Sequence, residues 1–316
     1  MTFSVAVIGA GVMGHGIAQS MALSGTNVNL YDLNREALIK ARSAIEKNLN
    51  LFVKYKLIEP SQREMVLKRV HFSNHLENCL VNSNYIIEAI PEIVDLKWGL
   101  YSTLEKICSE DTIIASNTST IPLTTLTQHS LVPERFIIAH FLNPAPLVPL
   151  VEVVKQDITS KATIQKTLTL LEKIGKSPVL LKKEVPGFIA NRLQAAVLRE
   201  AFSLMNEGVA DAADLDSVMK NGPGFRWAFI GPIETADFGG LDTWKRVLDN
   251  LSGDLNNSAK APEMLNELVK HNHLGVKTGN GIYNYEDVSI EKRVLERDES
   301  FLNLLKLKEK KISTHL

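Results

Sequence analysis

The chain has 316 residues, enough for about two domains, and its 45% hydrophobic content supports a large core and argues against disorder. Its net charge of −1 gives no sign of a nucleic-acid or membrane surface, and no apolar run reaches the roughly twenty residues that a membrane span requires. The two cysteines, Cys79 and Cys108, lack C-x-x-C spacing, so a reducing compartment is expected, here the cytoplasm.

The N-terminal residues predict a nucleotide-binding unit. An apolar strand over 3–8 leads into the glycine-rich turn 9–14, a helix over 12–23 follows, and a second strand over 27–31 ends at Asp32. The apolar start lacks the basic leader of a signal peptide, so we interpret it as a strand. Strand, glycine turn, helix, strand and acid follow in the order that dinucleotide binding requires.

Each glycine of this turn has a separate task in dinucleotide binding. Gly9 permits the tight turn, Gly11 leaves room for a pyrophosphate, and Gly14 lets the helix pack closely on the sheet. Because the helix begins with Val12 and Met13, its free N–H groups and its positive dipole end face the phosphates.

Asp32 indicates which nucleotide binds. A carboxylate eighteen residues after Gly14 can accept both hydrogen bonds of an adenosine ribose, and its charge repels a 2′-phosphate. NAD is therefore predicted over NADP, although the nearby Arg35 weakens this preference. A purely structural glycine turn is the alternative interpretation.

Strands and helices continue to alternate as far as residue 181. Asn34 is a plausible N-cap for a charged helix over 35–55. Further strands are predicted over 85–90, 112–115, 135–141, 150–154 and 179–181, and further helices over 96–107 and 160–174. This alternation predicts an α/β domain with a Rossmann-type, doubly wound parallel sheet.

The pattern changes near Lys182, and no strand is predicted beyond Gly187. We expect a domain boundary at about residue 184, with an NAD-binding domain over 1–184 and an all-α C-terminal domain over 185–316 that ends in a charged tail over 287–316. Helices are predicted over 188–207, 214–220, 264–272 and within 232–250. In such two-domain designs, we expect the ligand in the interdomain crevice that faces the carboxyl ends of the strands.

His140 and Glu152 are candidates for acid–base chemistry. Of the eight histidines, only His140 ends an apolar strand within a conspicuous segment, HFLNP. Glu152 stands in the strand LVEVV, where a buried carboxylate is costly unless it is paired, and a histidine on the neighbouring strand is its natural partner. Such a pair could remove the proton of an alcohol during oxidation by NAD. A buried structural His–Glu pair explains the spacing equally well.

Other polar residues are weaker candidates. Ser116 and Asn117 follow the strand over 112–115 at its carboxyl end, where a cap or turn role is an equal alternative. Asn191 lies on the apolar helix that follows Pro186, and a substrate oxygen could be its partner. No cluster has zinc-ligand spacing, so no metal site is predicted.

Seven motifs lie between residues 4 and 286: VIGAGVMGHGIA, IIEAIPE, SNTST, HFLNPAP, LVEVV, PGFIANRL and GVKTGNGIYNY. Together they resemble the motifs of the NAD-dependent L-3-hydroxyacyl-CoA dehydrogenase family. The resemblance implies that His140 is the general base in oxidation and the general acid in reduction, with Glu152 as its partner. It implies that Ser116 and Asn191 bind the reacting oxygen and position the acyl group. Three further residues would line the cofactor site: Glu92, Lys97 and Asn143.

The resemblance also implies a short substrate such as 3-hydroxybutyryl-CoA, a place in fatty acid metabolism, and a homodimer made by the helical domain. Two features depart from it. Asn48, Lys54 and Lys56 do not match the family's CoA contacts one to one. The segment GPGFRWAFIGPIET, with Arg226, is more similar to the L-gulonate 3-dehydrogenase and lambda-crystallin group.

A guanidinium in the cleft could clasp a free carboxylate in bidentate fashion, which makes Arg226 the discriminating residue. The alternatives are therefore an NAD-dependent dehydrogenase of a free 3-hydroxy acid, such as L-gulonate or carnitine, and a non-catalytic, crystallin-like NAD-binding protein.

Overall fold

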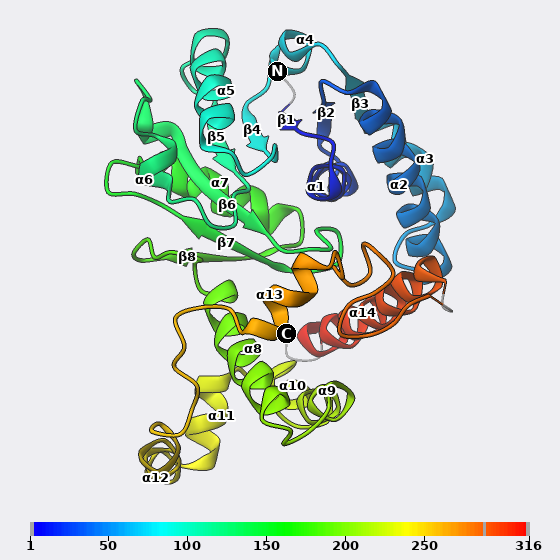
Figure 1. The fold of residues 1–316 in the computed structure, drawn as a ribbon. Helices are drawn as coiled ribbons and strands as arrows, with labels where there is room; N and C mark the ends of the chain where they lie inside the picture. Colours follow the sequence, from blue (N-terminus) through cyan, green and yellow to red (C-terminus); the bar gives the residue numbers. More distant parts are fainter. Residues whose placement is uncertain (1–2, 287–288, 314–316) are drawn as a thin grey trace. The chain divides into compact units, whose positions relative to one another are not determined.

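The computed structural model describes residues 3–286 and 289–313, and the chain divides into two compact units, Met1–Ile189 and Ala190–Leu316. The first unit contains a sheet with helices on both faces, and the second contains helices (Figure 1). The predicted fold class, a Rossmann-type α/β domain followed by an all-α domain, is confirmed. The division falls after Ile189, whereas the sequence analysis placed the boundary at about residue 184.

Eight strands form one sheet in the order β3-β2-β1-β4-β5-β6-β7-β8. Their bounds are β1 Ser4–Ile8, β2 Asn27–Tyr31, β3 Val70–Ser73, β4 Tyr85–Glu88, β5 Ile113–Ser116, β6 Phe136–Phe141, β7 Leu150–Val154 and β8 Ser177–Leu181. All neighbours run parallel except β6 and β7, which are antiparallel. The connection over 142–149 is too short for the crossover that a parallel pair needs.

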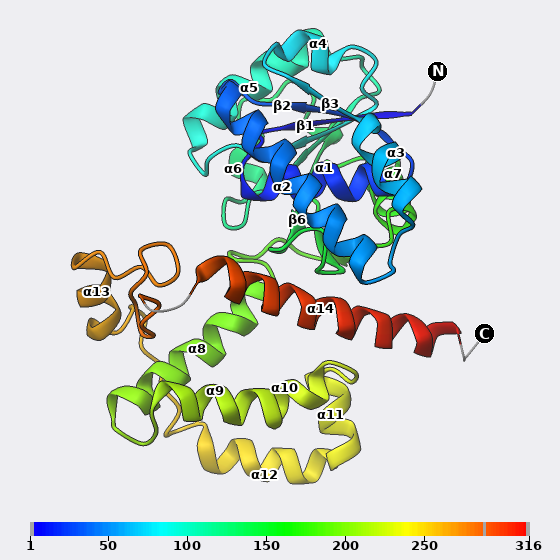
Figure 2. The same ribbon diagram turned by 90° about the vertical axis from the view of Figure 1, so that its right-hand side faces the viewer.

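Helices cover both faces of this sheet (Figure 2). Along β1, Val5 and Val7 belong to the core that α1, α2, α3 and α7 cover, whereas Ala6 and Ile8 belong to the core under α4, α5 and α6. This alternation is the two-residue period of a strand that is buried on both faces. The bounds are α1 Val12–Leu23, α2 Arg35–Lys54, α3 Pro60–Arg69, α4 Leu76–Leu80, α5 Val94–Ile107, α6 Leu123–Leu126 and α7 Lys161–Lys173.

Three elements, α3, β3 and α4, lie in the segment 56–84, for which the sequence analysis predicted none. Val66 is the one buried residue of α3. The four-residue strand β3 lies at the edge of the sheet and buries only Val70. Neither element therefore carries the apolar periodicity from which a helix or a strand can be recognised.

The second unit is helical over the residues that the structure describes, apart from isolated bridges between 275 and 284. Its helices are α8 Ala190–Asn206, α9 Ala212–Asn221, α10 Pro223–Trp227, α11 Pro232–Gly239, α12 Leu241–Leu251, α13 Glu263–Lys270 and α14 Ile290–Ser313. The charged tail predicted over 287–316 contains α14, and its residues 287, 288 and 314–316 lie outside the described residues. Within the described ranges, no helix has the length and apolar character that crossing a membrane would demand.

A buried lysine holds the loop between β6 and β7. Lys176 is 9% exposed, and its Nζ donates hydrogen bonds to the carbonyl oxygens of Ala145 and Val148 at 2.5 and 2.9 Å. Burial lowers the pKa of Lys176 from 10.5 to about 8. The folded chain therefore releases this proton at a lower pH than the unfolded chain does.

We predict a pH-dependent difference in stability between the wild type and Lys176→Met. Between the folded and the unfolded pKa of Lys176, the unfolded chain binds more protons, so the lysine's contribution to the free energy of unfolding rises with pH. The free energy of unfolding, measured with urea, should increase by about 1–3 kcal/mol more in the wild type than in the variant between about pH 7 and about pH 10. If the difference in unfolding free energy between the two proteins stays constant over this range, burial does not lower the pKa of Lys176.

Candidate active site

His140 and Glu152 lie side by side on β6 and β7. They are directly paired in the antiparallel register, and His140 Nδ1 lies 2.9 Å from Glu152 Oε2. His140 is 4% exposed and Glu152 is 1% exposed. Because a carboxylate only accepts hydrogen bonds, Nδ1 carries the hydrogen and Nε2 is the basic nitrogen of the ring.

Two residues at the end of the first unit contact this pair. The backbone N–H of Ile189 donates to Glu152 Oε1 at 2.8 Å, so both carboxylate oxygens have partners. The fully buried ring of Phe188 lies 5.4 Å from the imidazole, between ring centroids. Together these contacts fix the orientation of the imidazole ring.

The glycine turn between β1 and α1 has the backbone geometry that a phosphate needs. A Cβ on Gly14 would lie 1.7 Å from the Gly9 carbonyl oxygen, so only glycine allows this close packing. A Cβ on Gly11 would meet nothing within 4 Å, so the turn is open at that residue. Gly9 has a positive φ of 102°, which side chains disfavour.

The N-terminus of α1 suits an anion. Helix α1 begins at Val12, followed by Met13; it has no side-chain cap and no acidic residue in its first turn. Its first N–H groups can therefore bind a phosphate. At the end of β2, Asp32 accepts hydrogen bonds from the Ala10 and Asn34 N–H groups, each at 2.8 Å. Each carboxylate oxygen retains a lone pair for a ribose hydroxyl.

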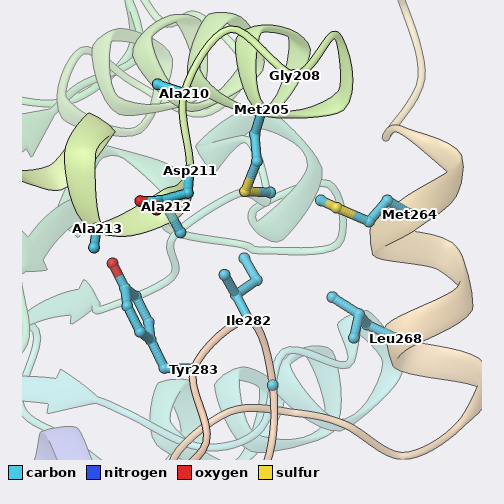
Figure 3. A pocket seen from close by; sticks show the side chains of 11 residues that line it. Met205, Gly208, Ala210, Asp211, Ala212, Ala213, Met264, Leu268, Ile282 and Tyr283 are labelled. Atoms are coloured by element: carbon cyan, nitrogen blue, oxygen red, sulfur yellow. The ribbon is translucent and has the colours of Figure 1, made fainter.

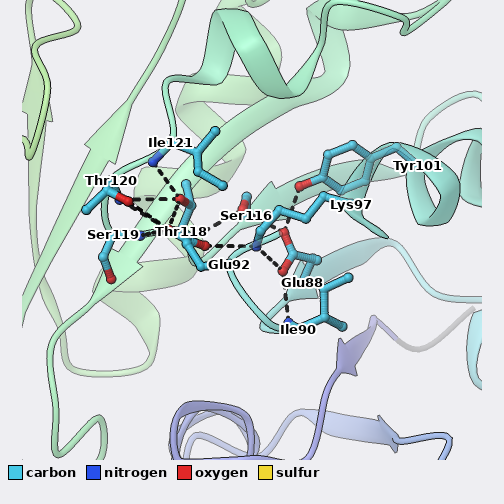
Figure 4. A network of polar contacts seen from close by, with 10 residues as sticks. All are labelled: Glu88, Ile90, Glu92, Lys97, Tyr101, Ser116, Thr118, Ser119, Thr120 and Ile121. Atoms are coloured by element: carbon cyan, nitrogen blue, oxygen red, sulfur yellow. Dashed lines mark hydrogen bonds and ion pairs between the residues drawn. The ribbon is translucent and has the colours of Figure 1, made fainter. Parts of the chain in front are cut away.

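Glu92 organises the turn that follows β5. Its Oε1 accepts hydrogen bonds from the Thr118 hydroxyl at 2.5 Å and from the N–H groups of Ser119 and Thr120 at 2.9 and 3.2 Å (Figure 4). Burial acts to raise the pKa of Glu92, but the Thr118 hydroxyl, the charge of Lys97 and the Ser119 N–H outweigh it, and the pKa is lowered. Glu92 therefore stays ionised and holds the turn in place.

Lys97 is buried rather than presented to a ligand. It is 1% exposed, and its Nζ lies 2.6 Å from Glu88 Oε1 and 3.2 Å from Glu92 Oε2. Any effect of Lys97 on a bound nucleotide therefore passes through these two carboxylates. Figure 4 shows the three side chains together with Ser116, whose hydroxyl donates to Glu88 Oε2 at 2.7 Å.

Four polar residues lie on one face of the sheet as two cross-strand pairs, and Ser116 stands opposite Ile138 rather than His140 in the register. Glu88 on β4 is paired with Ser116 on β5, and His140 on β6 is paired with Glu152 on β7. All four alternate with residues of the core under α1 and α7, so they share the face that α4, α5 and α6 cover. Asn117 links the two pairs, since its Oδ1 accepts the Phe141 N–H at 2.9 Å.

Two predicted site residues belong to none of the groups described above, namely these two pairs, the glycine turn with Asp32, and the contacting residues Glu92 and Lys97. Asn143 is exposed in the loop after β6. Asn191 belongs to the second unit, in the first turn of α8, and its part in the site stays a prediction. Neither Glu88 nor Phe188 was predicted as a site residue from the sequence. Glu88 was detectable by the argument applied to Glu152, because it is a carboxylate within an apolar strand.

The second unit has a separate hollow of about 750 Å³ (Figure 3). Its lining includes Met205, Met264, Leu268, Ile282 and Tyr283, and it contains no residue that the sequence analysis assigned to the site. In the part of the chain that the structure describes, no three His, Cys, Asp or Glu side chains gather in a way that could hold a metal ion.

Comparison with known proteins assigns both halves of the chain to domains of one enzyme family. Residues 4–185 match the NAD-binding domain of 3-hydroxyacyl-CoA dehydrogenase, and residues 187–285 match the C-terminal domain of the same enzyme. The predicted cofactor, NAD, is thereby confirmed. The open turn at Gly11, the uncapped α1 and the Asp32 carboxylate fit this nucleotide.

The chain is similar over most of its length to relatives with two kinds of substrate in their names. It is 40% identical over 281 residues to a probable 3-hydroxybutyryl-CoA dehydrogenase of Deinococcus radiodurans, covering 88% of this chain and 99% of that protein. It is 35% identical over 285 residues to 5-formyl-3-hydroxy-2-methylpyridine 4-carboxylate 5-dehydrogenase of Mesorhizobium japonicum, covering 90% and 91%.

A solved structure of an enzyme with the second specificity is also similar. It is the crystal structure of 5-formyl-3-hydroxy-2-methylpyridine 4-carboxylic acid 5-dehydrogenase, described as an NAD+-dependent dismutase. The TM-score is 0.91 at 33% identity, covering 98% of this chain and 99% of that one.

Proposed function

Because this chain belongs to the 3-hydroxyacyl-CoA dehydrogenase family, a family of NAD-dependent dehydrogenases, we propose that it interconverts a short L-3-hydroxyacyl-CoA and the 3-ketoacyl-CoA, with 3-hydroxybutyryl-CoA as the model substrate. The observation that carries the proposal is the buried His140–Glu152 pair, at 2.9 Å, on the sheet that also bears the glycine turn.

The proposed roles follow from the hydrogen-bonding capacity of each group. His140 Nε2 removes the proton of the C3 hydroxyl as the C3 hydride leaves, and it returns a proton in the reverse reaction. Glu152 Oε2 accepts the Nδ1 hydrogen and stabilises the positive ring that forms. Ser116 and Asn191 bind the substrate oxygens. NAD, when bound, supplies the hydride acceptor.

The nucleotide roles belong to the first unit. Gly9, Gly11 and Gly14 shape the turn over which the pyrophosphate lies, and the N–H groups of Val12 and Met13 face it. Asp32 accepts the ribose hydroxyls. Glu92, which follows β4, and Asn143, which follows β6, complete the proposed cofactor site, and Lys97 on α5 acts there through Glu88 and Glu92.

A side-by-side assay tests the substrate class. NAD reduction with L-3-hydroxybutyryl-CoA should be measured beside NAD reduction with L-gulonate and with carnitine, so that all substrates are compared in the direction of oxidation. We expect kcat/KM for L-3-hydroxybutyryl-CoA to exceed that for either free acid by at least about tenfold, equivalent to ~1.4 kcal/mol of transition-state binding. The reverse order would contradict the thioester proposal and leave the dehydrogenase family intact.

A second candidate is a small substrate with a free carboxylate. It is favoured by the TM-score of 0.91 to the enzyme that acts on a pyridine carboxylic acid. The exposed Arg226 on α10 could bind a carboxylate. Asn48 does not match the CoA contacts of the family one to one, and its amide donates a hydrogen bond to Gln19 Oε1 at 3.0 Å rather than standing ready for CoA. The assay should therefore include 5-formyl-3-hydroxy-2-methylpyridine 4-carboxylate as a third free acid.

We also propose that the second unit pairs with a second copy of the chain. None of the residues of α8 to α13 is buried, and Ile233, Phe238 and Phe225 are 80%, 78% and 69% exposed. Monomers rarely leave so much apolar side-chain surface in water, and the family resemblance implies a homodimer. Sedimentation velocity that gave the mass of one chain would contradict this pairing.

A further inference from the structure

His15 lies on α1 beside the nucleotide turn, and no step of the proposed function uses it. It is half-buried, and its Nδ1 lies 2.8 Å from the carbonyl oxygen of Gly11. Because a carbonyl oxygen only accepts hydrogen bonds, Nδ1 carries the hydrogen and donates it. The backbone N–H of His15 donates to the same oxygen at 3.2 Å. The Gly11 carbonyl is therefore held by two donors of one residue.

The start of α1 needs this support. Gly11 occupies the N-cap position without a side chain that could cap the helix, and the first turn contains no acidic residue. Gly14 and Gly16 are poor helix formers, but a Cβ on either would lie within 3.0 Å of a neighbouring atom. The His15 imidazole thus anchors a helix start that has no side-chain cap and contains two glycines in its first two turns.

Anchoring the Gly11 carbonyl also orients the N–H group on the other side of the same peptide bond. The peptide unit between Gly11 and Val12 is planar and trans, so its C=O and its N–H point in opposite directions. A carbonyl that is fixed toward the helix therefore fixes the Val12 N–H away from the helix. Two donors on the carbonyl oxygen also polarise the peptide unit, which strengthens its N–H as a donor.

We propose that His15 is a positioning residue for the pyrophosphate, because its imidazole holds the Gly11 carbonyl so that the Val12 N–H is preset toward the phosphate oxygens. His15 acts through this peptide unit and needs no contact with the nucleotide. The inference rests on the proposed nucleotide roles, in which the pyrophosphate lies over Gly11 and faces Val12. It gives His15 a share in nucleotide affinity and none in hydride transfer.

The imidazole of His15 acts as a neutral donor. Burial lowers its pKa, and the hydrogen bond to Gly11 offsets this effect only in part, so the ring is uncharged near neutral pH. Another neutral donor of suitable reach can therefore replace it. Ser20 is such a donor one turn further along α1, since its hydroxyl donates to the carbonyl oxygen of Gly16, also four residues back, at 2.9 Å.

The test is a titration of NADH into the wild type, His15→Ala and His15→Ser at neutral pH. We expect NADH to bind roughly 3- to 10-fold more weakly to His15→Ala, the effect of one lost hydrogen bond. Alanine is the better helix former, so this loss cannot result from a weaker helix. His15→Ser should bind NADH within about twofold of the wild type, because a serine hydroxyl can reach the carbonyl four residues back.

Ser20→Ala is the matched control. It removes the same kind of hydrogen bond from the same helix, at a carbonyl outside the nucleotide turn, so its NADH affinity should equal that of the wild type. Two further ligands, tested as competitors of NADH, locate the effect. ADP carries a diphosphate, and its affinity for His15→Ala should fall by the same factor as that of NADH. Adenosine carries no phosphate, and its affinity should not change.

Four results would overturn the inference: wild-type NADH affinity in His15→Ala, no recovery of affinity in His15→Ser, an equal loss in Ser20→Ala, or an equal loss for adenosine and ADP. Failure of the proposed nucleotide roles looks different, because Gly11→Ala would then also keep its NADH affinity. Failure of the proposed substrate would leave every one of these titrations unchanged, since none of them contains an acyl-CoA.

Discussion

Gly14→Ala should abolish NADH binding and destabilise the first unit. The added Cβ would lie 1.7 Å from the Gly9 carbonyl oxygen and 2.8 Å from its carbon, and both atoms belong to the backbone. No side-chain rotation relieves this overlap, so β1 and α1 must separate. We expect a loss of about 3 kcal/mol or more in stability and an NADH affinity at least ~100-fold weaker. Thermal unfolding and isothermal titration with NADH measure both quantities.

Gly11→Ala is the matched control, since it adds the same methyl group three residues earlier. Its Cβ would meet nothing within 4 Å, and Gly11 has a φ of −65° that alanine adopts without strain. We expect stability within about 0.5 kcal/mol of the wild type and a clear loss of NADH affinity. Wild-type affinity in Gly11→Ala would show that the pyrophosphate does not cross this residue.

His140→Gln should lose most turnover while NADH still binds. Glutamine can keep a hydrogen bond to Glu152, so the buried carboxylate retains a partner, but it cannot exchange a proton near neutral pH. General acid–base groups contribute typically ~10²- to 10⁴-fold, and kcat should fall within that range. Steady-state kinetics with acetoacetyl-CoA, beside an NADH titration, separates the two effects.

His129→Gln serves as the comparison for that variant. This exposed histidine packs edge-on against Trp98, with 4.5 Å between ring centroids, and has no part in the proposed site. Its kcat should equal that of the wild type. A parallel loss of NADH binding and turnover in His140→Gln would indicate that the histidine supports the fold rather than the reaction.

The sequence predicted those parts of the fold in which the apolar pattern is strong. Strand β7 was predicted over the residues that form it, because both faces of LVEVV are buried. Strand β3 and helix α3 were missed, because each buries a single residue. The antiparallel direction of β7 was not predicted, although the short connection over 142–149 contains the information.

Pairing across the sheet explains how far the site could be predicted. The proposal that Glu152 needs a partner on the neighbouring strand rests on the cost of burying a charge, and the register places His140 opposite it. The same cost applies to Glu88, in YIIEAI. Its partners Lys97 and Tyr101 lie on a helix, so strand pairing could not predict them.

A double-substitution cycle tests most directly whether His140 and Glu152 act as one acid–base unit. The measurement is kcat/KM for acetoacetyl-CoA in the wild type, His140→Gln, Glu152→Gln and the variant that carries both changes. If Glu152 works only through the imidazole, the double variant loses no more activity than His140→Gln alone. Losses that multiply would contradict the account, because the carboxylate would then contribute to turnover without the histidine.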